Sequence, residues 1–249
     1  LITLAADPET TVSQLTEIVS KDQVLASRLL SFANSAYCAS AVEICSIPEA
    51  VMRVGAGGVR NLAVTACFTS RMQDPQTYGS DGRRLVDHGV GTAYLAHLIA
   101  EDADVNEDAA FLCGLLHDIG KLVILKWLYD ARRRTGIATP EDVVAETVRH
   151  WHPTVAGLTF RRWNLPGDLD EPVMCHHDYR HATANRRLAA TVDLANRLSH
   201  RYGFGCDVDR EREVAGSPPM LELGLDEAWL ADVDERAPGL FAVARQALS

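Results

Sequence analysis

Apolar residues recur at helical spacing along almost the whole of this sequence. Val12, Leu15, Ile18 and Val19 follow the i, i+3, i+6, i+7 pattern that places side chains on one face of a helix. No segment of strand length alternates apolar and polar residues between hairpin turns. The sequence therefore predicts an all-α fold.

The same spacing, together with the positions of glycine and proline, predicts where the helices lie. Early in the chain the expected helices are 24–32, 47–54 and 59–71, with Gly55 to Gly58 ending the second of these. Further along they are 83–101, 107–127, 140–150, 153–163, 168–178, 186–202 and one or two helices within 225–248. Pro153 is the reason for separating 140–150 from 153–163, because proline interrupts the backbone hydrogen bonds of a helix.

A polar stretch from Gln73 to Gly82 is the best candidate for a domain boundary. Before it we expect an N-terminal helical lobe at 1–75, and after it a larger helical bundle at 83–205. Residues 206–249 are richer in Asp and Glu and are expected to form a C-terminal helical extension. Because a lobe of this length buries little core by itself, we expect it to pack against the bundle.

The charge balance limits the partners that this chain can bind. Lys and Arg together number 24 and Asp and Glu 34, so the formal net charge is −10. An acidic surface repels nucleic-acid phosphates and anionic lipid, and no apolar run reaches the roughly 18 residues that span a bilayer. We therefore expect neither nucleic-acid nor membrane binding. The glycine-rich turn at 55–58 has a faint likeness to a helix-hairpin-helix DNA-binding turn. Only Arg53 and Arg60 lie nearby, however, and any tight turn between helices uses glycine in this way.

The cysteines and the first residues bear on where the protein works. The six cysteines include no Cys-x-x-Cys pair, and several, such as Cys113, lie in apolar stretches. This usage fits small buried side chains in a reducing cytoplasm. The start of the chain lacks the basic and apolar regions of a signal peptide and also lacks an initiator Met. We therefore expect a cytoplasmic protein, and a fragment of a longer one.

Histidines and aspartates in apolar surroundings are the main functional signal. His117 and Asp118 lie within the apolar segment 115–123, where an unpartnered ionisable group costs several kcal/mol. A divalent metal and a hydrogen-bond network would both satisfy such groups. Similar residues lie on other expected helices, and a helical bundle can direct them toward one interior point. The candidate metal ligands are His88, His117, Asp118, His152, His176, His177 and Asp193.

The residue types narrow the choice of metal and add a candidate for substrate binding. Imidazoles suit Fe, Mn, Ni or Zn, and the two carboxylates could bridge two ions, whereas zinc fingers are excluded because usable thiolate pairs are missing. Lys121 follows Asp118 by three residues, so it would pair with that carboxylate or meet a substrate phosphate. Any single histidine is more often a hydrogen-bonded core residue. Four histidines are not among the candidate ligands. We interpret His97, His181 and His200 as surface residues or as residues with hydrogen-bond partners, and a helix would point His150 away from His152.

Four segments form a further pattern when they are taken in order. They are Lys21–Tyr37, Cys45–Gly55, Gly114–Leu122 and Trp163–Pro166. Together they resemble the HDOD domain (HD-related output domain) of the HD superfamily of metal-dependent phosphohydrolases, over residues 7 to about 202. The resemblance implies an all-α bacterial signalling module, often joined to receiver, kinase or cyclic-di-GMP domains. It also implies that the ligand set above is retained from HD phosphohydrolases, which many family members have lost.

Two functions follow from the resemblance. The first is a regulatory module without catalysis, which binds a signalling protein partner and keeps one or two divalent ions. The alternative is a metal-dependent phosphohydrolase acting on a nucleotide or cyclic nucleotide, with Asp118 holding or bridging metal and Lys121 neutralising phosphate charge. Asp178 to Ala182 stand in place of a Gly-Tyr-Pro loop, and Arg84 stands where that branch has a Glu ligand. Both departures argue against cyclic-di-GMP hydrolysis, and the regulatory function is preferred.

Overall fold

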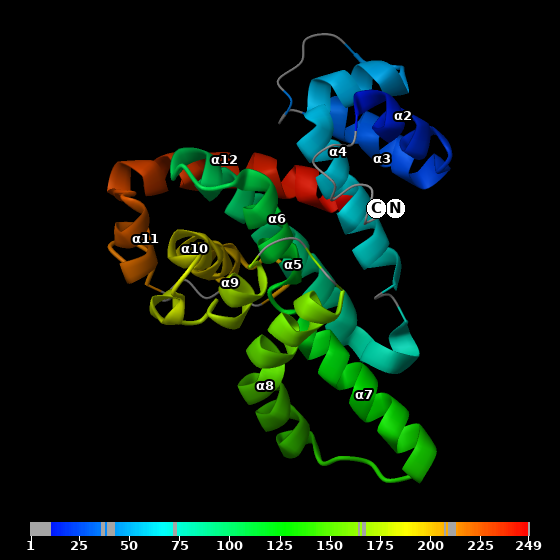
Figure 1. The fold of residues 1–249 in the computed structure, drawn as a ribbon, viewed down its shortest axis with the longest axis vertical. Coiled ribbons are helices and arrows are strands. Elements are labelled where there is room, and N and C mark those ends of the chain that lie inside the picture. The colour runs from blue at the N-terminus through cyan, green and yellow to red at the C-terminus, as the bar shows by residue number, and fades with distance from the viewer. Residues whose placement is uncertain are drawn as a thin grey trace. The chain divides into compact units, whose positions relative to one another are not determined.

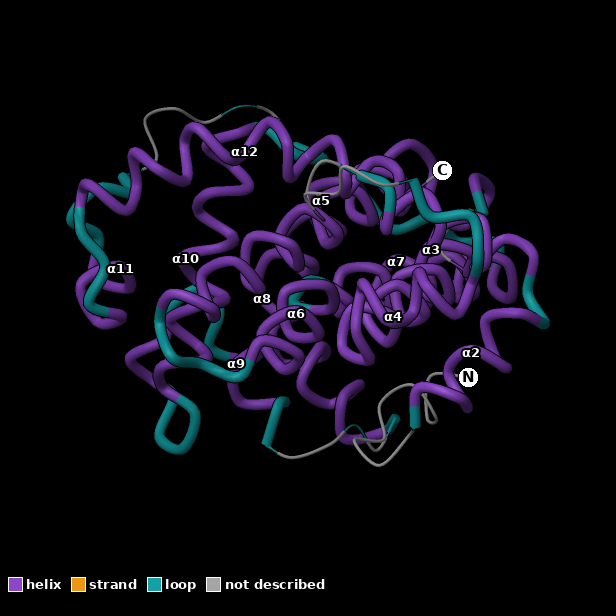
Figure 2. The backbone as a smooth tube through the Cα atoms, turned by 90° about the horizontal axis from the view of Figure 1, so that it is seen from above, coloured by secondary structure: helices purple, strands orange, loops and turns teal. Residues whose placement is uncertain are grey.

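The structure, a computed structural model, describes residues 11–35, 38, 43–71, 74–163, 165, 168–206, 208 and 213–248. Within these residues every regular element is a helix (Figure 1, Figure 2), which confirms the all-α prediction. In the same residues no helix is long and apolar enough to cross a lipid bilayer. Residues 1–10 of the predicted lobe, Ala36 and Tyr37 of the segment Lys21–Tyr37, and Asn164 and Pro166 of the segment Trp163–Pro166 lie outside the described residues.

The chain divides into two compact units. One consists of residues 1–71 and 232–249, and the other of residues 72–231. In the first unit α2 (Val12–Ser20), α3 (Gln23–Ala33) and α4 (Ile47–Arg71) pack on one another. The last helix, α12 (Glu227–Leu248), begins in the second unit and ends in the first. The predicted division at 1–75, 83–205 and 206–249, and the packing of lobe on bundle, stay predictions.

Two polar side chains define the ends of α3 in the first unit. Oδ1 of Asp22 accepts hydrogen bonds from the backbone N–H groups of Val24 and Leu25 at 3.0 and 3.1 Å, which caps the start of the helix. Asn34 follows the last turn and holds the main chain of Ile44: its Nδ2 donates to the carbonyl and its Oδ1 accepts from the N–H, both at 2.7 Å. The sequence therefore closes this loop with one amide side chain.

The second unit is a helical bundle. Its elements are α5 (Pro75–Asp102), α6 (Glu107–Leu116), α7 (Ile119–Thr135), α8 (Glu141–Arg162), α9 (Asp170–Met174), the 3₁₀ turn η2 (Tyr179–His181), α10 (Arg186–Tyr202) and α11 (Pro218–Leu223). α5 packs against α6, α7 and α10, and α7 and α8 form a long antiparallel hairpin (Figure 1). Side chains on α5, α7, α8 and α10 can thus face a shared interior.

The predicted helix 107–127 is wrong, because the structure has two helices there. α6 ends at Leu116 and α7 begins at Ile119, since Asp118 has φ −98° and ψ 9°, outside the helical range. In an unbroken helix two successive side chains point about 100° apart. The break instead brings His117 and Asp118 together, with Nε2 and Oδ2 3.3 Å apart.

The proline at 153 does not divide the helix that contains it. α8 continues from Glu141 to Arg162, so the predicted separation of 140–150 from 153–163 is wrong. His152 and Ala156 are buried on either side of Pro153, and α8 packs along α7. This burial outweighs the single backbone hydrogen bond that proline removes.

Three further boundaries show where glycine and polar residues act. α4 is interrupted only at Gly55 (φ 76°), so the predicted break between 47–54 and 59–71 is a kink at one residue. From Asp74 onward the predicted polar stretch is largely helical, because Asp74 caps α5 and only Gly79 (φ 59°) interrupts it. The predicted helix 168–178 is wrong in its second half: α9 ends at Met174, and the chain turns before His176.

Candidate metal centre

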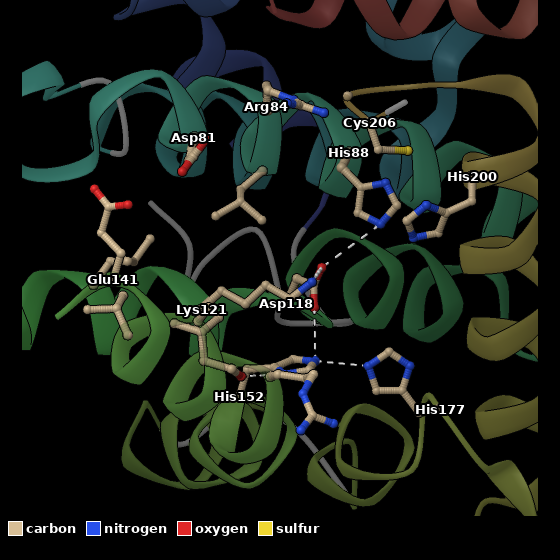
Figure 3. A pocket seen from close by; sticks show the side chains of 17 residues that line it. Asp81, Arg84, His88, Asp118, Lys121, Glu141, His152, His177, His200 and Cys206 are labelled. Atoms are coloured by element: carbon tan, nitrogen blue, oxygen red, sulfur yellow. Dashed lines mark hydrogen bonds and ion pairs between the residues drawn. The ribbon is translucent and has the colours of Figure 1, made fainter. Parts of the chain in front are cut away.

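Four separate stretches of the second unit bring six of the seven predicted ligands together. His88 comes from α5, His117 and Asp118 from the junction of α6 and α7, His152 from α8, and His176 and His177 from the turn after α9. Figure 3 shows Asp118 between His88 on one side and His152 and His177 on the other. Apart from His177, which reaches solvent, these residues are buried.

The carboxylate of Asp118 has a different set of neighbours at each oxygen. Oδ2 lies 3.3 Å from Nε2 of His117 and 3.9 Å from Nε2 of His88. Oδ1 lies 3.4 Å from Nε2 of His152 and 3.7 Å from Nε2 of His176. A carboxylate in this position can bridge two ions, with one oxygen toward each.

The imidazoles form two groups of the size that one ion requires. Ligand atoms of His88, His117 and Asp118 lie within 4.8 Å of one another, and so do those of His152, His176 and His177. In the second group Nε2 of His152 lies 3.0 Å from Nε2 of His177 and 3.4 Å from Nε2 of His176. Two nitrogens bound to one tetrahedral Zn²⁺ at about 2.05 Å would be about 3.3 Å apart. The spacing therefore fits a shared ion.

Backbone carbonyls orient the imidazoles. Nδ1 of His117 lies 2.8 Å from the carbonyl oxygen of Gly114, and Nδ1 of His152 lies 2.8 Å from that of Val148. Nδ1 of His176 lies 2.6 Å from the carbonyl oxygen of Val173. A neutral imidazole that donates from Nδ1 has its lone pair on Nε2. In each case Nε2 faces Asp118, so the local turn selects the tautomer that binds a metal.

Burial keeps four imidazoles of the centre neutral. Burial lowers the pKa of His88 to about 3 and that of His177 to about 4, and it also lowers the pKa of His152 and His176. Burial alone would raise the pKa of Asp118, but the nearby His117 and Lys121 outweigh it and hold that pKa well below the usual range. Near pH 7 the centre thus offers the neutral nitrogens of His88, His152, His176 and His177 and the carboxylate of Asp118, the protonation states that bind a cation.

Two buried atoms of the centre have no hydrogen-bond partner: Nε2 of His117 and Oδ1 of Asp118. Leaving such atoms unpaired costs about 1–3 kcal/mol each. Both face the same interior and both are metal-ligand types, so the residues present fit a divalent ion. Gly120 allows this closeness, because a Cβ there would lie 2.0 Å from the carbonyl oxygen of His152 and would push α7 away from α8.

A cavity of about 1050 Å³ opens beside the centre. Half-buried Lys121 lines it and places Nζ 2.6 Å from Oδ2 of Asp118, so the predicted pairing of these residues is present. Two further cations, Arg84 and Arg149, and two carboxylates, Asp81 and Glu141, also line the cavity. Figure 3 shows three of them, Arg84, Asp81 and Glu141. The wall therefore carries charges of both signs.

Asp193 is the predicted ligand that the structure does not bring into either group. It is buried on α10, and its Oδ1 accepts a hydrogen bond from Nε of Arg197 at 2.7 Å. Asn196, on the same helix, places Oδ1 3.1 Å from Nε2 of His88 instead. That Asp193 binds metal stays a prediction.

The histidines outside the predicted set have varied surroundings. His150 and His181 are exposed, and half-buried His97 lies 3.7 Å from a carboxylate oxygen of Glu107. His200 is half-buried, lines the cavity, and has its ring centroid 4.9 Å from that of His88. His200 lies seven residues after Asp193 on the same helix, and this spacing indicates that the two side chains lie on one helix face. Cys206, also on the cavity wall, follows in a loop and carried no such signal.

Comparisons with known proteins agree with this architecture. The family model of the HDOD domain matches residues 1–179. An uncharacterized protein from Treponema pallidum (strain Nichols) is 27% identical over 200 residues, a match that covers 76% of this chain and 38% of that protein. The chain thus spans well under half the length of this relative.

Solved structures share the fold. An HDOD domain protein of unknown function from Geobacter sulfurreducens has a TM-score of 0.73 at 22% identity, covering 99% of this chain and 89% of that one. A Shewanella amazonensis SB2B protein provisionally named a metal-dependent phosphohydrolase has a TM-score of 0.68 at 18% identity, covering 97% and 88%. A Marinobacter aquaeolei VT8 protein provisionally named for signal transduction has a TM-score of 0.69 at 22% identity, covering 100% and 58%.

Proposed function

The chain belongs to the HDOD family, and from this premise we propose that it is a bacterial signal-transduction module, regulatory rather than catalytic, with a divalent-metal centre around Asp118. One observation supports the centre most: one buried carboxylate lies between two groups of imidazoles whose Nε2 atoms face it. One or two ions of Fe, Mn, Ni or Zn would satisfy these groups. A bound ion would then brace the four stretches of chain that supply the ligands.

Three features favour a regulatory module. Lys121 pairs directly with Asp118, and Asp193 pairs with Arg197, so both predicted catalytic or ligating charges already have protein partners. The segment after His177 holds an ion pair between Asp178 and Arg180, with Nε and Oδ1 2.7 Å apart, in place of the Gly-Tyr-Pro loop. A solved relative carries a name for signal transduction, and we propose a signalling protein as the partner.

The test compares metal content and thermal stability. Protein purified without added metal should contain near-stoichiometric transition metal, and a chelator should lower its melting temperature. An ion at 100 times its Kd stabilises by about 2.7 kcal/mol, which corresponds to roughly 5–10 °C for a chain of this size. His152→Ala should lose bound metal, whereas the exposed His181→Ala should not. Equal metal content in the two variants would overturn the proposed centre, and Asp193→Asn tests the remaining predicted ligand.

The cavity supports a second candidate function, a metal-dependent phosphohydrolase acting on a nucleotide or cyclic nucleotide. A divalent ion in the centre would polarise a phosphoryl group and lower the pKa of bound water. Lys121 and Arg84 line the cavity beside that point and would neutralise phosphate charge. A volume of about 1050 Å³ accommodates a nucleotide.

Phosphate release separates the two candidates. Protein loaded with Mn²⁺ or Fe²⁺ is incubated with nucleotides and cyclic nucleotides, beside a Lys121→Ala variant of equal metal content. Metal-dependent release by the wild type and its loss in the variant would establish the hydrolase. A chelator-sensitive melting temperature without phosphate release supports the regulatory module.

A further inference from the structure

A second group of metal-ligand atoms lies on the cavity side of His88. Ligand atoms of His88, His200 and Cys206 lie within 4.8 Å of one another, and all three residues line the cavity. Figure 3 shows the rings of His88 and His200 side by side, with the sulfur of Cys206 next to them. This group contains a thiol, whereas the groups around Asp118 contain only nitrogen and oxygen ligands.

The loop that carries Cys206 is built to lie against α5. Gly203, with φ 70°, ends α10 in the left-handed conformation. The ring of Phe204 then lies on Gly91, where a Cβ would come 2.1 Å from its Cδ1. Gly205 has φ 67°, and a Cβ there would come 2.2 Å from the backbone nitrogen of His88. The main chain of the loop therefore contacts α5 at His88, which belongs to the same group of ligands as Cys206.

Hydrogen bonds orient two of the three side chains, those of His88 and Cys206. Nδ1 of His88 lies 3.2 Å from the carbonyl oxygen of Phe204. Sγ of Cys206 donates to the carbonyl oxygens of Ser199 and Phe204 at 3.7 and 3.5 Å. Ser199 is adjacent to His200 at the end of α10, so one short segment, 199–206, positions both new ligands. The group thus rests on a defined scaffold.

We propose that His88, His200 and Cys206 form a second metal site, which shares His88 with the Asp118 centre and binds Zn²⁺. One thiolate and two imidazoles are ligands that Zn²⁺ prefers, and carboxylate-selecting ions such as Mg²⁺ and Ca²⁺ are excluded by this chemistry. Binding releases the thiol proton of Cys206 to solvent as the sulfur–metal bond forms. The cavity borders all three ligands, so a solvent molecule can take the fourth position.

His88 connects the new site to the Asp118 centre, because it is a member of both groups. Zn²⁺ bound through Cys206 would engage an imidazole that the other centre also faces. We therefore expect the two sites to compete for His88, so that loading one weakens the other. The thiol site would in this way make the Asp118 centre responsive to zinc.

Cobalt(II) provides a direct test, because a cysteine thiolate bound to Co²⁺ gives a charge-transfer absorption in the near ultraviolet that imidazole and carboxylate ligands do not. Metal-free wild-type protein titrated with Co²⁺ should show this absorption, and Zn²⁺ should remove it by displacement. Cys206→Ser and His200→Ala should each lose it. Cys175→Ser, a half-buried cysteine elsewhere in the second unit, should keep it.

The outcomes separate this site from the Asp118 centre. His152→Ala should lose metal equivalents and keep the thiolate absorption, whereas His88→Ala should lose both. Absence of the absorption in folded wild-type protein, or its survival in folded Cys206→Ser, would overturn the second site. Far-ultraviolet circular dichroism establishes that each variant is folded. Failure of the proposed Asp118 centre would instead appear as unchanged metal content in His152→Ala.

Discussion

The two units of the chain bury different kinds of side chain. In the first unit the described buried polar residues are hydroxyl-bearing ones, Ser35, Thr65 and Thr69, among aliphatic residues such as Leu29. The second unit buries His88, His117, Asp118, His152, His176 and Asp193. Burying an ionisable group costs free energy unless it gains a partner. Apolar packing therefore accounts for the stability of the first unit, whereas the stability of the second unit also depends on what its polar interior binds.

Because of this difference, we expect different treatments to change the stability of each unit. Metal, chelator and ligand substitutions should act on the second unit, and large-to-small core substitutions in the first should leave the metal unchanged. Tryptophan fluorescence can report the second unit separately, because all four tryptophans lie between residues 127 and 229. Circular dichroism reports the helices of both.

The largest expected effect is a core truncation in the first unit. Leu29 on α3 has 0% of its surface exposed, and Leu29→Ala should cost about 2–5 kcal/mol of unfolding free energy. In urea, the circular dichroism signal should show an earlier loss of helix while the tryptophan midpoint and the bound metal stay unchanged. A tryptophan midpoint that moves with the helix signal would show that the units unfold as one, and the comparison between them would fail.

The next effect concerns the metal-dependent part of stability in the second unit. Asp118→Asn removes the charge between the two imidazole groups, so the stabilisation that added metal confers, about 2.7 kcal/mol at 100 times Kd, should disappear from the tryptophan transition. Asp178→Asn is the matched control, since that carboxylate is outside both groups and pairs with Arg180. Metal stabilisation that persists in Asp118→Asn would contradict the bridging position of this carboxylate.

The sequence predicts most of this architecture because helix periodicity is a local property. α10 was predicted at 186–202 and occupies Arg186–Tyr202, where buried residues recur on one face and Gly203 ends the helix. The break at Asp118 could not be predicted in this way, because apolar residues continue on both sides of it and hide the change of direction. The break predicted at Pro153 was wrong for the opposite reason, because tertiary packing outweighed the local tendency of proline to end a helix.

The sequence identifies the residue types of the site but not the distances between their ligand atoms. Ionisable residues in apolar segments identified the histidines and Asp118, yet which Asp118 oxygen faces which imidazole depends on how α5, α7 and α8 pack. Asp193 shows the limit, because its pairing with Arg197 lies on the same helix at i+4 and was overlooked. Cys206 was overlooked because a loop has no periodicity to place it against His88.

A smaller effect tests the polar closure of the first unit. Asn34→Ala removes both hydrogen bonds to the main chain of Ile44, and the buried carbonyl and N–H would lose their partner. We expect a loss of about 1–2 kcal/mol in the circular dichroism transition, with no change in tryptophan fluorescence. Gln14→Ala, which removes only exposed bonds near the start of α2, should stay within about 0.5 kcal/mol of wild type. Equal losses in the two variants would show that Asn34 is not the closing residue.

The smallest effect is electrostatic and belongs to the second unit. Glu171 accepts hydrogen bonds from the N–H groups of Thr183, Ala184 and Asn185 at 2.7 to 2.9 Å, just before α10 begins. Burial would raise the pKa of this carboxyl, but these bonds outweigh it and lower the pKa from 4.5 to about 2. Because Glu171 is only half-buried, solvent screening limits the contribution, and Glu171→Gln should cost only about 1 kcal/mol near pH 7.

The pH dependence distinguishes this anchor from the buried imidazoles. A folded-state pKa below the unfolded value gives stability that is present above about pH 4.5 and is lost as the pH falls toward 2. The difference in tryptophan midpoint between wild type and Glu171→Gln should therefore shrink over that range, while the imidazole contribution, common to both proteins, cancels. Glu101→Gln, an exposed carboxylate on α5, should show no such difference. A wild-type advantage that stayed constant down to pH 2 would mean that neutral hydrogen bonding, and not the charge of Glu171, anchors the start of α10.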